Sequence, residues 1–199
     1  MQYIGIFLMG YLIGSLPFSY LIARYWKGID IRQTGSGNVG STNVWRNAGT
    51  AAGLLAFACD FGKGSLVVVL AGCFGGANLV VTAAIAVLVG HSWPVFLGFK
   101  GGKMVATGVG VIMAISPIIG GISMIAWLII LFITRYVSLA SIITLIGIPV
   151  LMLYYSLELP YVLLGILMAV VTTVRHFPNI KRLMAGTEPK VKYGLRLMK

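Results

Sequence analysis

Long apolar runs, separated by short glycine-rich and basic segments, dominate the chain. Lys, Arg, Asp and Glu are absent from residues 1–23, 64–99, 104–134, 136–157 and 159–174. A helix needs about 20 apolar residues to cross the hydrocarbon core of a bilayer, and several of these runs reach that length. The pattern therefore predicts an all-α integral membrane protein that forms a single polytopic membrane domain over residues 1–199.

The number of membrane spans depends on how Asp60 and Lys63 are interpreted. If the two charges mark a loop, the chain forms eight helices and most of the cations face outside. If residues 48–72 form one helix, seven helices result, and every Lys and Arg except Lys63 lies on the cytoplasmic side. Because cytoplasmic loops carry the excess of lysine and arginine, we predict a seven-transmembrane-helix bundle with the N-terminus outside and the C-terminus in the cytoplasm. The expected helices span residues 2–23, 48–72, 78–91, 104–116, 118–134, 137–156 and 160–175.

Short or re-entrant helices are expected near the cytoplasmic face. Residues 104–116 would extend only about 20 Å as a helix, so this helix must begin deep in the membrane or the bilayer must thin around it. The aromatic segment 92–97 is typical of an interfacial or re-entrant stretch. Asp60 and Lys63 lie three residues apart on one helix face, where we expect them either to form a structural ion pair or to line a site.

The charge composition excludes several kinds of chemistry. The chain has 15 Lys and Arg but only 4 Asp and Glu, which gives a net charge of +11. So few carboxylates do not suit a Mg²⁺ site, and Cys59 and Cys73 would be about 20 Å apart on one helix, too far for a disulfide. We therefore expect no metal and no cofactor. The cations follow the membrane topology, so their excess does not indicate a nucleic-acid partner.

The first polar segment, residues 35–46, reads GSGNVGSTNVWR. It matches GxGxxG, but a dinucleotide site requires a preceding strand in a βαβ unit, for which this chain has no room. The segment is either a flexible linker or a loop whose amides and side chains bind an anion at the start of a helix. Its dense side-chain donors favour the anion site. The candidate residues are Ser36, Gly37, Asn38, Thr42, Asn43 and Arg46.

The second polar segment, residues 100–103, reads KGGK and resembles half of a P-loop. Leu97 replaces the first glycine of that motif and Met104 replaces the Ser or Thr that would bind Mg²⁺, so nucleotide hydrolysis is not expected. Two glycines, two lysines and the start of a helix still favour phosphate binding. The alternative is a basic anchor at the membrane edge, whose lysines reach toward the headgroups.

The third polar segment, residues 175–188, follows the last apolar run. His176 either caps the helix end or takes part in a site, and the neighbouring cations bind either lipid headgroups or a substrate. The predicted topology brings all three segments to the cytoplasmic face, whereas a transporter would place polar groups at the midplane between repeated halves. This arrangement indicates an enzyme that joins a water-soluble phosphate compound to a lipid-like one.

Three stretches, GSGNVGSTNVWR at 35–46, GHSWPVFLGFKGGKMVATG at 90–108 and HFPNIKRLMAGTE at 176–188, resemble the signature segments of the bacterial acyl-phosphate-dependent glycerol-3-phosphate acyltransferase family. The resemblance covers nearly the whole chain in order. It implies transfer of a fatty acyl group from acyl phosphate to the 1-hydroxyl of glycerol 3-phosphate, giving lysophosphatidic acid and phosphate in the bacterial cytoplasmic (inner) membrane. The HxxxxD signature of the soluble-donor class is absent. Where the family usually has a glycine after KGGK, this chain has Met104.

The resemblance and the charges together assign roles to individual residues. Two anionic substrates repel each other unless cations and N–H donors offset their charge. We therefore expect Arg46, Lys103 and the amides of Gly101 and Gly102 to bind phosphate, while side chains of the first segment donate to the acyl phosphate or to the developing oxyanion. The catalytic candidates are Ser36, Arg46, Lys103, His176 and Asn179, and the binding candidates are Gly37, Asn38, Thr42, Asn43, Gly101, Gly102, Ser141, Arg182 and Glu188.

Two groups can act as the general base. His176 can take the hydroxyl proton, or the phosphate of glycerol 3-phosphate can take it, since its second pKa is about 6. We favour the phosphate because no His–carboxylate pair occurs at close sequence spacing. A small organic-phosphate transporter is the alternative function, and a CDP-alcohol phosphotransferase would need a multi-Asp metal signature that is absent. The expected partners are the two substrates, the lipid bilayer and the soluble enzyme that makes acyl phosphate, and we expect a monomer.

Overall fold

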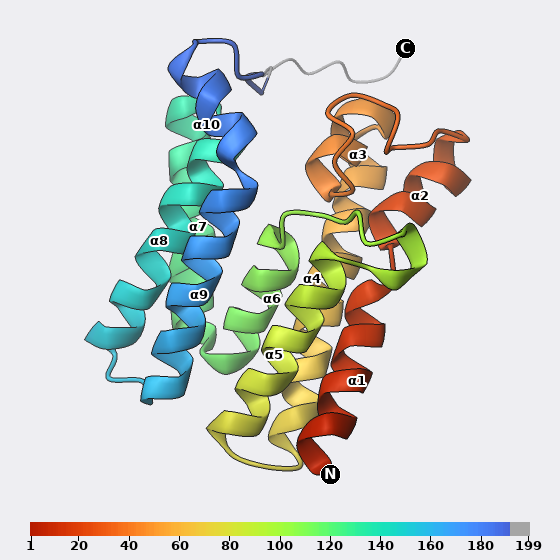
Figure 1. The fold of residues 1–199 in the computed structure, drawn as a ribbon. Coiled ribbons are helices and arrows are strands. Elements are labelled where there is room, and N and C mark those ends of the chain that lie inside the picture. The colour runs from red at the N-terminus through yellow and green to blue at the C-terminus, as the bar shows by residue number, and fades with distance from the viewer. Residues whose placement is uncertain (192–199) are drawn as a thin grey trace.

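Residues 1–191, which the computed structural model describes, form ten α-helices and one 3-10 helix and contain no strand (Figure 1). The predicted all-α fold is thereby confirmed. The N-terminus lies at one end of the bundle, and α2, α3, α10 and the loop before α6 lie at the other end (Figure 1). The elements are α1 (Gln2–Ser15), α2 (Phe18–Lys27), α3 (Ser41–Ala48), α4 (Thr50–Gly72), α5 (Ala77–Ser92), η1 (Val95–Leu97), α6 (Val105–Ile115), α7 (Pro117–Thr134), α8 (Val137–Tyr154), α9 (Leu159–Arg175) and α10 (Phe177–Met184).

Five segments in residues 1–191 are long and apolar enough to cross a membrane. A sixth is added if α9 and α10, which are bent by 59° at His176, count as one span. Helix α6 is apolar but only 11 residues long, or about 16 Å, so it would not cross a bilayer of ordinary thickness alone. The count of seven spans and the orientation therefore stay predictions. The five segments are Gln2–Lys27, Thr50–Gly72, Ala77–Leu97, Pro117–Thr134 and Val137–Tyr154.

Two of the expected boundaries are wrong. The helix expected over 2–23 is broken, because Pro17 has no amide hydrogen to continue the hydrogen-bond ladder, so α1 ends at Ser15 and α2 begins at Phe18. The loop expected over 24–46 ends in a separate helix, α3. Gly49 separates α3 from α4 with φ +96°, a conformation that a residue with a Cβ atom rarely adopts. The remaining predicted helices differ from the observed ones by no more than two residues at either end.

The buried faces of the long helices form one continuous apolar core. Buried side chains of α1, α4, α5, α6, α7, α8 and α9 contribute to it, including Val67, Val87, Ile112, Leu145 and Leu164. Large apolar side chains on the outer faces of these helices stay exposed, as expected where lipid replaces water as the solvent. The core therefore holds the helices together and positions the loops at the α3 and α10 end.

Helices α1 and α5 approach each other closely along a seam of small residues. A Cβ atom added to Gly14 would lie 2.3 Å from the carbonyl oxygen of Val87, and one added to Gly90 would lie 2.3 Å from that of Tyr11. Gly10 is less tightly enclosed, with its nearest neighbour at 3.0 Å. The spacing of Gly10 and Gly14 thus serves helix packing, as small residues do in membrane bundles.

Substitution of Gly14 tests this seam. Gly14→Val forces α1 away from the α5 backbone and should destabilise the protein by about 1–3 kcal/mol, the usual cost of overpacking. Gly5→Val is the matched control, because nothing lies within 4 Å of a Cβ atom at Gly5 in the same helix. Thermal unfolding of the purified variants in detergent measures the difference. Equal melting temperatures for the two variants would contradict a backbone contact at Gly14.

Candidate anion-binding site

The three polar segments converge at one end of the bundle, as the sequence predicts. Arg46 in α3 donates to the carbonyl oxygen of Pro189 at 3.3 Å. Lys103 in the loop before α6 donates to the Oδ1 atom of Asn179 in α10. Gly102 lies against the first segment, since a Cβ atom there would be 2.7 Å from the carbonyl oxygen of Val39. Contacts between residues up to 143 positions apart thus join the three segments, and α3 and α10 lie at the same end of the bundle (Figure 1).

Asn43 organises the first segment from a buried position at the start of α3. Its Nδ2 atom lies within 3.1 Å of the carbonyl oxygens of Ile31, Thr34 and Asn38. Its Oδ1 atom accepts from the amide of Ser36 at 3.2 Å and from the side chain of Asn47 at 2.9 Å. These contacts occupy its amide group, so in this structure Asn43 shapes the loop.

The segment shaped by Asn43 presents several predicted residues at the surface. Ser36 and Gly37 are exposed, and Asn38 and Thr42 are half-buried. Gly37 has φ +70°, and the turn there begins at Thr34. The side chains that were expected to donate to a substrate therefore lie at the rim of the site, within reach of solvent.

The glycine loop, residues 98–104, rests on the end of α5. The amide of Gly101 donates to the carbonyl oxygen of Ser92 and that of Gly102 to the carbonyl oxygen of His91, both at 3.1 Å. The prediction that these two amides bind phosphate does not fit this structure, because both already have an acceptor. A Cβ atom at either position would lie 2.2 Å from an atom of His91. The two glycines are thus needed for close packing.

Met104 ends the glycine loop in a strained conformation. Its φ of +56° lies in the left-handed region, which costs a residue with a Cβ atom about 1–2 kcal/mol. The side chain is buried in the core beside α6, and burial of an apolar side chain of this size contributes about 1.5–3 kcal/mol. The packing of Met104 offsets the strain at a position where the family that this chain resembles usually has glycine.

A chain of polar contacts links Lys103 to the C-terminal segment. Asn179 accepts from Lys103 and donates to the Oε1 atom of Glu188 at 2.7 Å. The same carboxylate accepts from Ser138 at 2.7 Å and, through Oε2, from the Nε atom of Arg182 at 2.7 Å. Glu188 is only 7% exposed. A single buried carboxylate therefore holds α8, α10 and, through Asn179, the glycine loop together.

Burial and neighbouring charges shift the pKa values of this chain. Burial lowers the pKa of Lys103 to about 8, and repulsion from Arg182 adds to the effect, while Glu188 opposes it. Burial acts to raise the pKa of Glu188, but hydrogen bonds from Asn179, Ser138 and Arg182 outweigh it and keep that pKa below its usual value. The charges of Glu188 and Arg182 also act on the pKa of Arg46. Cations thus exceed carboxylates at the site, which favours an anionic ligand.

His176 and Ser141 are the predicted residues with the fewest links to this chain. The Nδ1 atom of His176 donates to the carbonyl oxygen of Thr172 at 2.8 Å, which leaves Nε2 as the ring's only acceptor in the neutral form. Ser141 donates to the carbonyl oxygen of Val137 and accepts from Trp127. Ser138, one turn earlier in α8, is the serine that contacts Glu188.

Sequence reasoning missed Ser138, Arg175 and His91. Arg175 donates to the carbonyl oxygens of Ser92 and Gly101 at 3.3 and 3.2 Å and stacks over the ring of Trp93. Arg175 lies in the third polar segment, and His91 lies in the second stretch that resembles the family. The sequence therefore contained a signal for both residues. Ser138 carried no such signal beyond its position beside Arg135.

The described residues offer no grouping of three or more His, Cys, Asp or Glu side chains that could hold a metal ion. Lys103, Arg46 and Arg182 instead place positive charge and N–H donors around Glu188 and Asn179. Such a cluster suits an anionic ligand, which cations bind through charge-assisted hydrogen bonds. The fold and the site together define a helical integral membrane protein with a candidate anion-binding site at one end of its bundle.

The chain belongs to the glycerol-3-phosphate acyltransferase family, whose model matches residues 4–186. It is similar to the glycerol-3-phosphate acyltransferase of Desulforamulus reducens, with 44% identity over 182 residues and 91% of each chain covered. It is also similar to that of Synechococcus sp. strain CC9902, with 46% identity and 92% of each chain covered. The resemblance to this family is thereby confirmed.

Two crystal structures of PlsY (YgiH), an integral membrane glycerol 3-phosphate acyltransferase, share this fold. The glycerol 3-phosphate form matches with a TM-score of 0.93 and 38% identity, and the lysophosphatidic acid form with 0.91 and 37%. Each comparison covers 96% of both chains. The fold of this chain is therefore that of an integral membrane enzyme.

Removal of the Glu188 charge tests the electrostatics of the site. Glu188 raises the pKa of Lys103, so in Glu188→Gln the ammonium should lose its proton at a pH below about 8. The pH dependence of acetylation at Lys103, followed by mass spectrometry, measures the midpoint. Glu158→Gln is the matched control, because Glu158 precedes the first turn of α9, and α9 begins at the opposite end of the bundle from α10 (Figure 1). An unchanged or higher midpoint in Glu188→Gln would show that the two groups are not coupled.

Proposed function

We propose that this protein transfers a fatty acyl group from acyl phosphate to the 1-hydroxyl of glycerol 3-phosphate, giving lysophosphatidic acid and phosphate. The observation that carries the proposal is the convergence of Arg46, Lys103 and Arg182 around the buried Glu188–Asn179 pair. Family membership supplies the reaction, and the excess of cations suits two substrates that each carry a phosphate. One chain supplies every residue assigned to the site, so a monomer is sufficient.

We further propose that the site faces the cytoplasm of a bacterial inner membrane. Helices α2, α3 and α10, together with the loops at the same end of the bundle, carry most of the described cations, including Arg24, Lys27, Arg46 and Arg182. Because cytoplasmic loops carry the excess of Lys and Arg, this end belongs in the cytoplasm, where the water-soluble glycerol 3-phosphate can reach it. The N-terminus then lies outside, with α6 as a short seventh span.

Arg46 and Lys103 are the groups assigned to the phosphates. Binding both substrates side by side brings two anions together, so the site must supply fixed positive charge before they arrive. Lys103 is held by Asn179, which in turn donates to Glu188. A half-buried, oriented ammonium gains more from a phosphate than a fully solvated one, because less water competes for it. Ser36 and Thr42, at the rim, are placed to donate to the acyl phosphate.

The reaction needs no covalent intermediate on the protein. The 1-hydroxyl oxygen of glycerol 3-phosphate attacks the acyl carbonyl carbon, the new ester C–O bond forms, and the bond from that carbon to the phosphate oxygen breaks. The hydroxyl proton passes to the phosphate of glycerol 3-phosphate, whose second pKa is about 6. Phosphate is a good leaving group, so the main task of the site is to position the substrates and to stabilise the developing charge.

His176 is better suited to orientation than to proton removal. Its Nδ1 atom donates to the carbonyl oxygen of Thr172, the residue is 4% exposed, and among the described residues no carboxylate forms a hydrogen bond with it. A histidine base usually gains its basicity and tautomer from such a partner. The histidine that does lie beside a carboxylate is His91, 3.6 Å from Asp60, and it lies below the glycine loop.

A direct assay tests the function. Purified protein in detergent, given palmitoyl phosphate and glycerol 3-phosphate without added metal, should release inorganic phosphate and form lysophosphatidic acid in equal amounts. Palmitoyl-coenzyme A in place of palmitoyl phosphate should give no product. Omission of glycerol 3-phosphate is the control for simple hydrolysis. Absence of phosphate release from the complete mixture would refute the proposal and would favour a transporter.

Two substitutions test the assigned roles. Arg46→Ala should lower the rate by roughly 100-fold or more, the usual effect of removing one group that stabilises transition-state charge. His176→Ala should retain measurable turnover, because general-base catalysis, worth about 100-fold or more, resides on the substrate. Rates are measured in variants whose melting temperatures match the wild type. Complete loss in His176→Ala, in protein that still binds glycerol 3-phosphate, would instead assign the base to His176.

A further inference from the structure

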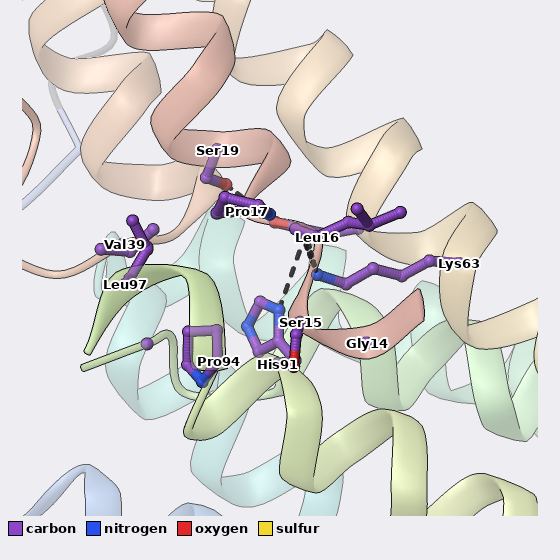
Figure 2. A pocket seen from close by; sticks show the side chains of 12 residues that line it. Gly14, Ser15, Leu16, Pro17, Ser19, Val39, Lys63, His91, Pro94 and Leu97 are labelled. Atoms are coloured by element: carbon purple, nitrogen blue, oxygen red, sulfur yellow. Dashed lines mark hydrogen bonds and ion pairs between the residues drawn. The ribbon is translucent and has the colours of Figure 1, made fainter. Parts of the chain in front are cut away.

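A cluster of buried polar side chains lies beneath the glycine loop and has no part in the mechanism above. This buried polar cluster consists of Ser19, Asp60, Lys63 and His91. Asp60 is 2.8 Å from the ammonium of Lys63, accepts from Ser19 at 2.7 Å and lies 3.6 Å from Nδ1 of His91. Figure 2 shows Lys63 and His91 reaching toward the same region beside Leu16 from separate helices.

Stability alone does not account for these charges. The side chains of Asp60 and Lys63 are 2% and 3% exposed, and apolar residues of similar volume are often as stable as a buried ion pair. The cavity that the cluster borders has a volume of only about 10 Å³, room for about one water molecule. The cluster therefore binds no substrate itself, and its function must be exerted through its neighbours.

The cluster touches elements that carry two of the site's three segments, the first polar segment and the glycine loop. Lys63 donates to the carbonyl oxygen of Leu16 at 2.9 Å, at the break between α1 and α2. Ser19 connects the cluster to α2, which leads into the first polar segment, and Val39 of that segment borders the same cavity. Asp60 and Lys63 belong to α4 and His91 to the end of α5.

His91 carries these contacts directly to the glycine loop. Its carbonyl oxygen accepts from the amide of Gly102, and its Nε2 atom lies 2.2 Å from where a Cβ atom of Gly102 would be. The glycine loop thus lies directly on the imidazole ring, with no room for a side chain between them. Lys103 is the next residue, so any tilt or shift of the ring moves the backbone that bears its ammonium.

We propose that Asp60 holds the ring of His91 in place and that His91 is a positioning residue, which sets the height of the glycine loop and so the location of Lys103 in the site. This proposal rests on the proposed function, because Lys103 is the group assigned to substrate phosphate. It gives the ion pair of Asp60 and Lys63 a function: the ammonium balances the carboxylate, and the carboxylate supplies the oxygen, 3.6 Å from Nδ1, that orients His91.

Two matched double variants separate positioning from simple stabilisation. Asp60→Asn/Lys63→Met removes both charges but keeps an oxygen acceptor for His91. Asp60→Leu/Lys63→Met removes both charges and the acceptor. In Asp60→Leu/Lys63→Met, kcat/KM for glycerol 3-phosphate should fall by roughly 100-fold, as expected for a displacement of about 1 Å at the reacting groups. The loss should appear mainly in KM, while Asp60→Asn/Lys63→Met stays close to wild type.

Amide hydrogen exchange supplies a readout that needs no activity. The amides of Gly101 and Gly102, now bonded to α5, should exchange faster in Asp60→Leu/Lys63→Met than in Asp60→Asn/Lys63→Met. If the wild type shows no acyl transfer, the proposed function fails, and the exchange comparison still tests the positioning of the loop. If Asp60→Leu/Lys63→Met does not fold, His91→Phe replaces it, since phenylalanine keeps the ring and removes the nitrogen that faces Asp60.

Three results would overturn the proposal. Equal exchange rates and equal KM values in the two double variants would show that the acceptor for His91 is irrelevant. An equal loss of activity in both, in folded protein, would assign the effect to the charges alone. Faster exchange of the glycine amides without a change in KM would show that the loop does not position Lys103 for glycerol 3-phosphate.

Discussion

The hydrogen bonds to the buried carboxylate of Glu188 are the interactions on which the rest of the site depends. This carboxylate lies in a cluster of cations and accepts hydrogen bonds from Ser138, Asn179 and Arg182, so it fixes the C-terminal segment against α8 and α10. Asn179 extends this contact to Lys103. Without a buried anion at this point, the cations would repel each other, and α10 and the glycine loop would lose their common anchor. One negative charge thus organises the site that we propose to bind negatively charged substrates.

The membrane imposes a complementary constraint on the other side of the glycine loop. Charged groups within apolar helices are costly unless they are paired, and Asp60, Lys63 and His91 satisfy one another there. The glycine loop lies between this buried polar cluster and the Glu188 chain. It is therefore held from below through His91 and from above through Lys103, while its glycines allow backbone contact with α5. A loop fixed on both sides keeps its lysine oriented before a substrate binds.

The comparison of expectation with structure follows a physical division. Apolar runs predict α4, α5, α7, α8 and α9 to within a few residues, because hydrophobic length is a local property of the chain. The ion pair of Asp60 and Lys63 was predictable for the same reason, since two residues three positions apart on one helix always lie close together. The separation of α1 from α2 was missed although Pro17 signalled it, because an uninterrupted apolar run outweighed one proline.

The sequence by itself determined the class of the molecule, the approximate spans and the three segments that form the site, because hydropathy, charge and motif residues are written along the chain. Only the tertiary structure decided how individual groups are used. It engages the amides of Gly101 and Gly102 with α5 and the side chain of Asn43 within its own loop, and it selects Ser138 over Ser141 for contact with Glu188. These assignments depend on contacts between residues far apart in sequence, and the separation of such residues along the chain does not reveal which atoms meet.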